Sequence, residues 1–369
     1  MNARPLLPHL RRMLHVGPYG GELPVALRAA ASVAVPMLVL WATGHLEWSL
    51  YATFGAFTSL FGRTVPIRAR LLMQVQAGGV LVASVLLGTL IAVLSPTASA
   101  AGWVVVPVAA VWATAVAILS HRLRWHPPGP LFPVFALGAC SSVPAGPDRL
   151  PVALAVTVVA ALFALALTVA IARFERGAAA PAPTPARPPA PASASAPAQA
   201  PDPAKAPAGR SGPAPEWTLS HYLVRYAVGV AVAGAIATAV GHPYWAMVAA
   251  VVPMSAPDAA GRLTRAAQRL AGTLVGVVIA WVLLTAAPPP LVVITIAALL
   301  QAGAELYVGR NYGVAMLFIT PLALSMAQLA NPVPVGELVA DRALDTLVGV
   351  AVAVVITLLT HERRQDPEG

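Results

Sequence analysis

Long apolar stretches, separated by short polar turns, run along most of the chain. A helix that crosses the hydrocarbon core of a bilayer needs about 20 apolar residues, each adding about 1.5 Å. Segments near that length lie at 24–43, 71–94, 102–120, 150–172, 221–240, 269–287, 290–308, 312–330 and 343–360. Shorter apolar segments lie at 48–61, 128–143 and 244–257. We therefore predict an all-α polytopic membrane protein with about 12 transmembrane helices.

A change of composition divides these segments into two groups of six. Residues 177–215 are rich in Pro, Ala and Ser, and 12 of them are proline. Proline has no N–H donor, so this stretch is expected to be an extended, disordered linker. The predicted organisation is an N-terminal segment, a first six-helix repeat, this linker, a second six-helix repeat and a tail, at 1–23, 24–176, 177–215, 216–360 and 361–369.

The two groups read as copies of one unit. Residues 44–48 (GHLEW) return as 241–245 (GHPYW), and the offset is constant because 241 − 44 and 245 − 48 both equal 197. The same offset pairs Arg28 with Arg225 and Gly79 with Gly276. Polar residues and glycines in one register indicate an internal duplication. Six helices per repeat would insert both repeats in the same orientation.

Composition and charge support a membrane location. The chain is 58% hydrophobic and 10% charged, too few charges to cover a soluble surface. The net charge of +9 does not indicate nucleic acid, because the arginines lie between apolar segments. With the N-terminus inside, 21 of the 23 basic residues fall on the cytoplasmic side. Only Arg149 and Arg342 fall outside, so both termini are predicted to be cytoplasmic.

Two short segments are candidates for a substrate pathway. Residues 48–61 and 244–257 occupy equivalent places, and Gly55 and Pro253 are predicted to break them. Paired broken helices expose backbone dipoles at mid-depth and often mark a transport site. The alternative is a tilted or re-entrant helix that only packs.

Further pathway candidates are polar or aromatic residues near helix ends. Arg28 and Arg225 either extend toward the membrane surface or attract carboxylates beside a central pathway. Trp48 and Trp245 are candidate interface anchors. His45 and His242 either hydrogen-bond the turn or titrate near neutral pH.

The most polar helix end is the stretch that contains Glu305, Arg310, Asn311 and Tyr312. Its carboxylate serves either a structural ion pair or the coupling of transport. None of the predicted spans carries a carboxylate at its centre, which argues against a buried proton relay. Close helix packing is expected at small residues four apart, namely Gly79, Ala83, Gly272, Gly276 and Ala280.

Motifs for enzymatic chemistry are missing from the sequence. It has no phosphate-binding G-x-x-x-x-G-K-[ST] loop, no H-E-x-x-H and no nucleophile elbow. The lone Cys140 excludes an intrachain disulfide and is expected in the core. We therefore expect no enzyme activity, no cofactor and no metal site.

Several of these stretches resemble a known family. They are residues 243–250 (PYWAMVAA), 269–276 (RLAGTLVG), 310–312 (RNY) and 318–322 (FITPL), with 51–57 (YATFGAF) and 62–63 (GR) in the first half. They look like the integral-membrane transporter domain of the fusaric acid resistance family, which is grouped with aromatic acid exporters and includes actinobacterial members. Larger members carry a folded cytoplasmic domain where this chain has only the linker.

The resemblance implies a secondary transporter of the bacterial plasma membrane, an efflux permease for small aromatic or carboxylate anions. The expected partners are the lipid bilayer, the organic anion and, left open, further copies of the chain. Three alternatives remain at this point. They are a passive anion channel, a non-transporting scaffold of the cell envelope, and a transporter of the major facilitator architecture. Two features argue against the last: the second span is short, and loop 62–70 lacks the Asp expected in that superfamily.

Overall fold

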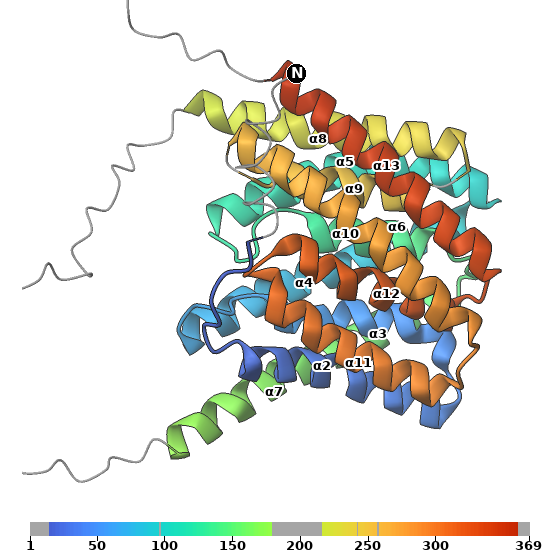
Figure 1. Ribbon diagram of the computed structural model, residues 1–369. Helices are drawn as coiled ribbons and strands as arrows, with labels where there is room; N and C mark the ends of the chain where they lie inside the picture. The colour runs from blue at the N-terminus through green and yellow to red at the C-terminus, as the bar shows by residue number, and fades with distance from the viewer. Residues whose placement is uncertain (1–14, 96, 179–215, 242, 257, 361–369) are drawn as a thin grey trace, which may run out of the picture.

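The first six helices occupy the chain before the linker. The computed structural model describes residues 15–95, 97–178, 216–241, 243–256 and 258–360, and all regular structure in them is helical (Figure 1). These helices are α2 (Leu23–Thr43), α3 (Ser49–Ala56), α4 (Ile67–Leu94), α5 (Ala98–Arg122), α6 (Leu131–Ser141) and α7 (Arg149–Ala178). The short 3-10 helices η1 (Leu46–Trp48) and η2 (Phe57–Leu60) flank α3.

Six further helices follow the linker. They are α8 (Glu216–Ala239), α9 (Pro243–Met254), α10 (Ala259–Thr285), α11 (Pro290–Val308), α12 (Tyr312–Ala330) and α13 (Val335–Leu359). Among the described residues, eight helices are long and apolar enough to cross a bilayer, namely α2, α4, α5, α7, α10, α11, α12 and α13. The predicted all-α, multi-pass membrane class is therefore confirmed. The predicted linker lies outside the described residues from 179 onward.

The short helices lie in the centre of the bundle. All eight residues of α3 are buried, and α9 is buried from Trp245 to Met254. At 1.5 Å per residue these helices are only about 12 to 18 Å long, shorter than the helices around them. The longer helices around them direct apolar side chains outward, as Val75, Val111 and Leu299 do. Such exposed apolar surface suits lipid rather than water.

Helices of the two halves pack against one another. α5 lies along α8, and α2 lies along α11, so each half provides an outer helix to the other. Within the halves, α3 packs on α7 and α4 on α6, while α9 packs on α13 and α10 on α12. The pair α3 and α7 thus corresponds to α9 and α13, and the pair α4 and α6 corresponds to α10 and α12, six helices further along the chain.

Glycines permit the closest helix contacts. A Cβ atom on Gly272 would collide with the backbone oxygen of Gly313, and one on Gly276 would lie 2.7 Å from Thr320 Cβ, so both bring α10 against α12. Gly79 is different, because it is exposed and nothing lies within 4 Å of a Cβ placed there. The prediction that Gly79 mediates close packing is wrong. Its neighbour Gly78, which faces Thr58, makes the close contact instead.

Two helix starts and one break differ most from the sequence prediction. α10 begins at Ala259 and α13 at Val335, ten and eight residues before the predicted 269 and 343. The prediction followed apolar residues only, so it left out the first turns of α10 and α13, which contain charged residues. Such turns are helical when their side chains find partners. α3 is not broken at Gly55; it continues to Ala56 and tightens into η2, while Gly55 lets α3 approach the backbone of α7.

Candidate substrate cavity

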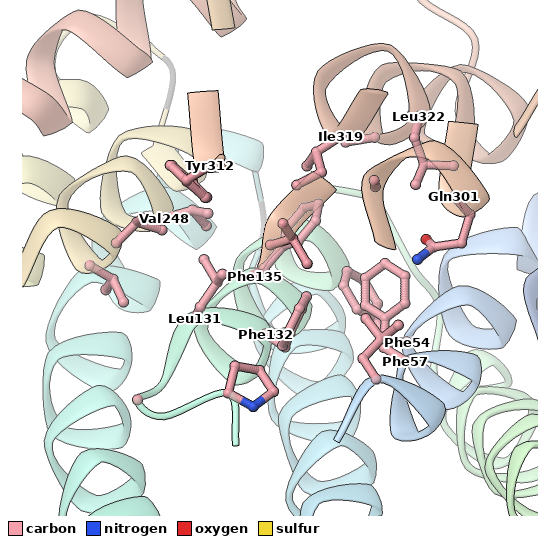
Figure 2. Close-up of a pocket in the computed structure, with 18 of the residues that line it drawn as sticks. Phe54, Phe57, Leu131, Phe132, Phe135, Val248, Gln301, Tyr312, Ile319 and Leu322 are labelled. Carbon is pink, nitrogen blue, oxygen red and sulfur yellow. The ribbon is translucent and has the colours of Figure 1, made fainter. Parts of the chain in front are cut away.

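A cavity of about 370 Å³ lies between helices of the two halves (Figure 2). Its walls come from α3 and α6 of the first half and from α9, α11 and α12 of the second, with α10 and α13 adding polar groups. Trp245 and Ser255 both line it, so it extends about 15 Å along α9. This volume is in the range of cavities that hold small organic ligands.

Four phenyl rings from the first half form one wall, defined here as the phenyl wall: Phe54, Phe57, Phe132 and Phe135 (Figure 2). Phe54 and Phe135 meet edge to face at 5.1 Å between centroids, and Phe57 meets Phe132 at 5.3 Å. Aromatic rings pack favourably in such offset or edge-to-face arrangements. The phenyl wall therefore offers a planar ring further contacts of the same kind.

The second half supplies cations to the same cavity. Arg269 of α10 and Arg342 of α13 both line it and are both buried. Arg269 Nη1 donates to the Tyr312 hydroxyl at 2.7 Å. Arg342 lies over the ring of Trp245 at 4.2 Å, a cation–π contact. The cavity thus has an apolar side and a cationic side.

Arg342 is the least satisfied of these groups. It is 2% exposed, and its Nε and Nη1 atoms have no hydrogen-bond partner among the described residues. A buried guanidinium is stable only when its charge and donors are met, and a carboxylate meets both. One turn along α13, Asp345 is 1% exposed, and the described residues offer neither of its carboxylate oxygens a hydrogen bond.

These two residues correct the sequence prediction. The sequence places Arg342 on the outer side of the membrane and predicts no carboxylate at the centre of a span. Because α13 begins at Val335, Arg342 and Asp345 lie inside the helix, and both are buried. The helix start, set by Pro334 at the N-cap, decides their depth.

An ion pair joins the two halves beside the cavity. Arg63, which follows η2, approaches Glu305 of α11 with 3.5 Å between Nη1 and Oε2, and its Nη2 donates to the Glu305 carbonyl at 2.8 Å. Both residues line the cavity. Of the two roles considered for Glu305, the geometry matches the structural ion pair.

Arg310 and Asn311 hold the N-terminal segment and do not line the cavity. Arg310 Nε donates to the Gly17 carbonyl at 2.8 Å, and Asn311 Nδ2 donates to the His15 carbonyl at 3.0 Å. Asn311 also caps α12 by accepting from the Val314 N–H. Tyr312, next in sequence, does line the cavity.

Arg28 and Arg225 lie away from the cavity lining. Arg28 is buried and its Nη2 is 3.4 Å from the Ser59 carbonyl oxygen; Arg225 Nη2 donates to the Thr360 carbonyl at 3.1 Å. Both guanidinium groups therefore meet backbone carbonyls near helix ends. Arg269 and Arg342, which are not among the residues predicted for the pathway, do line the cavity, as do Arg63 and Arg265.

The repeated tryptophans have different surroundings. Trp48 stacks on His45 at 4.0 Å in the turn before α3, and His45 Nδ1 lies 3.4 Å from Glu47. Trp245 is 4% exposed and forms part of the cavity. His242 lies outside the described residues, and Pro253 sits in the last turn of α9, off the lining.

Comparisons with known proteins find one family model and one relative. Residues 218–356 match a family model described as fusaric acid resistance protein-like. An uncharacterized membrane protein of Bacillus subtilis (strain 168), YvaC, is 30% identical over 130 residues, which cover 35% of this chain and 21% of that protein. This chain therefore aligns with about a fifth of the relative's length. No solved structure matches.

Proposed function

We propose that this protein, whose residues 218–356 match the fusaric acid resistance protein-like family model, is a secondary transporter of small organic anions. The observation that carries the proposal is Arg342, a buried guanidinium with unpartnered donors that lines a largely apolar cavity. The phenyl wall of the same cavity favours anions that carry an aromatic ring. The carboxylate of such an anion would pair with Arg342 and Arg269, and its ring would pack against the phenyl wall.

The proposal includes the architecture of two parallel six-helix repeats. Its support is the packing pattern, in which α5 on α8 corresponds to α11 on α2, and α3 on α7 corresponds to α9 on α13. A rotation that exchanges the halves would reproduce every one of these pairs. Repeats related in this way place a substrate site at their interface, where the cavity lies.

The direction and location also belong to the proposal. We assign the protein to the bacterial plasma membrane with cytoplasmic termini, on the distribution of arginines. Export of the anion follows from the family resemblance. Neither an enzyme reaction nor a cofactor has a role in this scheme.

The test uses the purified full chain in liposomes with radiolabelled 4-hydroxybenzoate, and protein-free vesicles as baseline. We expect saturable flux that Arg342→Gln reduces about tenfold or more, because a hydrogen bond to a charged group contributes about 1.5–3 kcal/mol. Arg173→Gln is the matched control, since Arg173 is exposed near the end of α7. The control should keep the parent rate.

Other outcomes separate the alternatives. Flux that does not saturate and follows voltage would identify a passive channel. No flux of any member of a broad panel of organic anions, together with stable co-purification of an envelope protein, would overturn transport in favour of a scaffold.

A further inference from the structure

The proposed transport of anions leaves Asp345 without a role. This residue lies ten positions into α13, about 15 Å from the start of a helix of 25 residues. It is 1% exposed, and neither carboxylate oxygen has a hydrogen-bond partner among the described residues. Carboxylates buried in this way inside membrane helices are rare because of the desolvation they suffer, and they mark functional sites.

The charged and titratable groups around Asp345 and Arg342 come from α13, α9, α10 and, through Tyr312, α12. On α13 itself they are Asp341 and Arg342, and Arg342 is three residues away, on the same helix face. From α9, Tyr244 is close enough to interact electrostatically with both Arg342 and Asp345. From α10, Arg269 faces Arg342 and donates to Tyr312.

The remaining neighbour, α8, brings its charge only to the far end of α13. There Arg225 donates to the carbonyl of Thr360, and Tyr226 lies beside Arg225 in sequence. Since 360 − 345 = 15, this contact is about 22 Å from Asp345 along the helix. Arg342 is therefore the cation within one helical turn of the carboxylate.

Burial limits which charge states this pair can adopt. An isolated charge in a low-dielectric interior is strongly unfavourable, so the charge of Arg342 needs a nearby anion. Two anions can serve: the ionised Asp345, or a substrate carboxylate in the cavity. When the substrate carboxylate takes this role, an ionised Asp345 would be a second buried anion close to the substrate carboxylate, and binding a proton removes the repulsion between the two.

We propose that Asp345 binds one proton each time an organic anion binds Arg342, so that the protein carries the anion and the proton together. This inference rests on the proposed function. Arg269 contributes the same +1 in both states. In the empty protein, Arg342 (+1) and ionised Asp345 (−1) sum to zero. In the loaded protein, Arg342 (+1) and the substrate carboxylate (−1) sum to zero, and Asp345 is a neutral acid. The proton comes from the side on which the anion binds and leaves with it.

The consequence is transport without net movement of charge. Each cycle transfers the equivalent of one undissociated acid, so flux follows the gradients of anion and proton and not the membrane voltage. Export in this mode suits an acid produced inside the cell, because it removes the anion together with the proton that its formation released.

The experiment follows lumenal pH and labelled anion together, in liposomes loaded with 4-hydroxybenzoate and a pH dye, at mildly alkaline pH. Valinomycin and potassium gradients set the voltage, and protein-free vesicles give the baseline. We expect the lumen to become more alkaline as the anion leaves, with one proton per anion, and the rate to be the same at all voltages.

Two carboxylate variants make the test specific. Asn imitates the protonated acid, so Asp345→Asn should lose net efflux about tenfold or more and still exchange labelled for unlabelled anion across the membrane. Asp341→Asn, four residues earlier on α13 and half-buried, is the matched control and should keep net efflux and proton movement.

The outcomes are distinguishable from failure of the proposed function. Anion flux that follows voltage and leaves lumenal pH unchanged overturns proton coupling while transport stands. Net efflux with proton movement retained in Asp345→Asn also overturns it. If Asp345→Asn loses exchange too, the parent protein's proton-to-anion ratio decides alone. Absence of both flux and exchange in the parent protein refutes transport itself.

Discussion

At the scale of single residues, identical side chains acquire different roles from what packs around them. Trp48 and Trp245 occupy the same place in the duplicated sequence, yet Trp48 stacks on a histidine in a turn and Trp245 lies under Arg342 in the cavity. The difference arises because α13 presents an arginine to Trp245. The side chains that touch a residue come from distant segments of the chain, and these contacts determine its chemical role.

Phe135 shows how one ring joins the apolar and cationic sides of the cavity. It contacts Phe54 at 5.1 Å and Trp245 at 5.0 Å between centroids, so it belongs to the phenyl wall and touches the ring under Arg342. A substrate ring between these groups would gain contacts that a saturated ring of similar size would not. Phe135 is therefore a candidate determinant of selectivity.

Replacing Phe135 with leucine should lower the affinity for 4-hydroxybenzoate about 2- to 10-fold, since an aromatic pair contributes about 0.5–1.5 kcal/mol. Affinity for cyclohexanecarboxylate should stay within a factor of about two. Competition against labelled 4-hydroxybenzoate in liposomes measures both. Phe174→Leu, at an exposed position of α7, is the control. Equal losses for the two competitors would contradict a role for the ring.

At the scale of helices, close approach depends on which small residue faces a neighbour. Gly276 and Gly79 are counterparts at the offset of 197 residues. Gly276 faces Thr320 and Met316 on α12, whereas Gly79 faces outward from α4. On α4 the close contacts instead involve Gly78, and Gly88 against α6. The same helix pair is thus packed through different positions in the two halves.

This difference makes the glycine pair a matched test. Gly276→Ala should destabilise the protein by roughly 1–3 kcal/mol, because its Cβ would lie 2.7 Å from Thr320 Cβ and 2.9 Å from the Met316 carbonyl oxygen. Gly79→Ala should leave stability unchanged or raise it by up to about 1 kcal/mol, since alanine favours helix. Unfolding of both variants in detergent gives the comparison. A loss of stability at Gly79 as large as at Gly276 would mean that α4 also packs closely there.

At the scale of the whole molecule, the two halves are held together by helices that pack on helices of the other half and by an ion pair. α2 lies on α11 and α5 on α8, which places the cavity in the interface and not inside one half. Arg63 and Glu305 bridge the same interface. Movement of one half against the other would therefore alter the cavity and this ion pair together.

A double-mutant cycle measures the bridge between the halves. Arg63→Ala should lower the free energy of unfolding in detergent, because it leaves Glu305 buried without its cation. In a Glu305→Gln background the same change should cost about 0.5–3 kcal/mol less, the coupling expected of residues in direct contact. Arg68→Ala, an exposed arginine of α4, should show no coupling to Glu305. An equal loss of unfolding free energy on Arg63→Ala, with Glu305 present or replaced by Gln, would show that the ion pair does not stabilise the protein.

The sequence by itself determined the class of the protein and the approximate place of its helices. Runs of about 20 apolar residues with few charges leave a spanning helix as the stable conformation. α2, α11 and α12 lie at the predicted 24–43, 290–308 and 312–330 to within a residue. These features depend on composition over a window of residues. They can be predicted without knowledge of any tertiary contact.

Only the tertiary structure decided which polar groups meet in the cavity. Arg28 and Arg225 were selected because they recur, yet their guanidinium groups meet backbone carbonyls, whereas Arg269 and Arg342 lie at the interface with the first half. Asp345 was expected at the end of a span and not near its centre, because the predicted start of α13 is eight residues too late. The physical reason is that burial and charge pairing are properties of contacts between distant segments, which hydropathy along one segment does not contain.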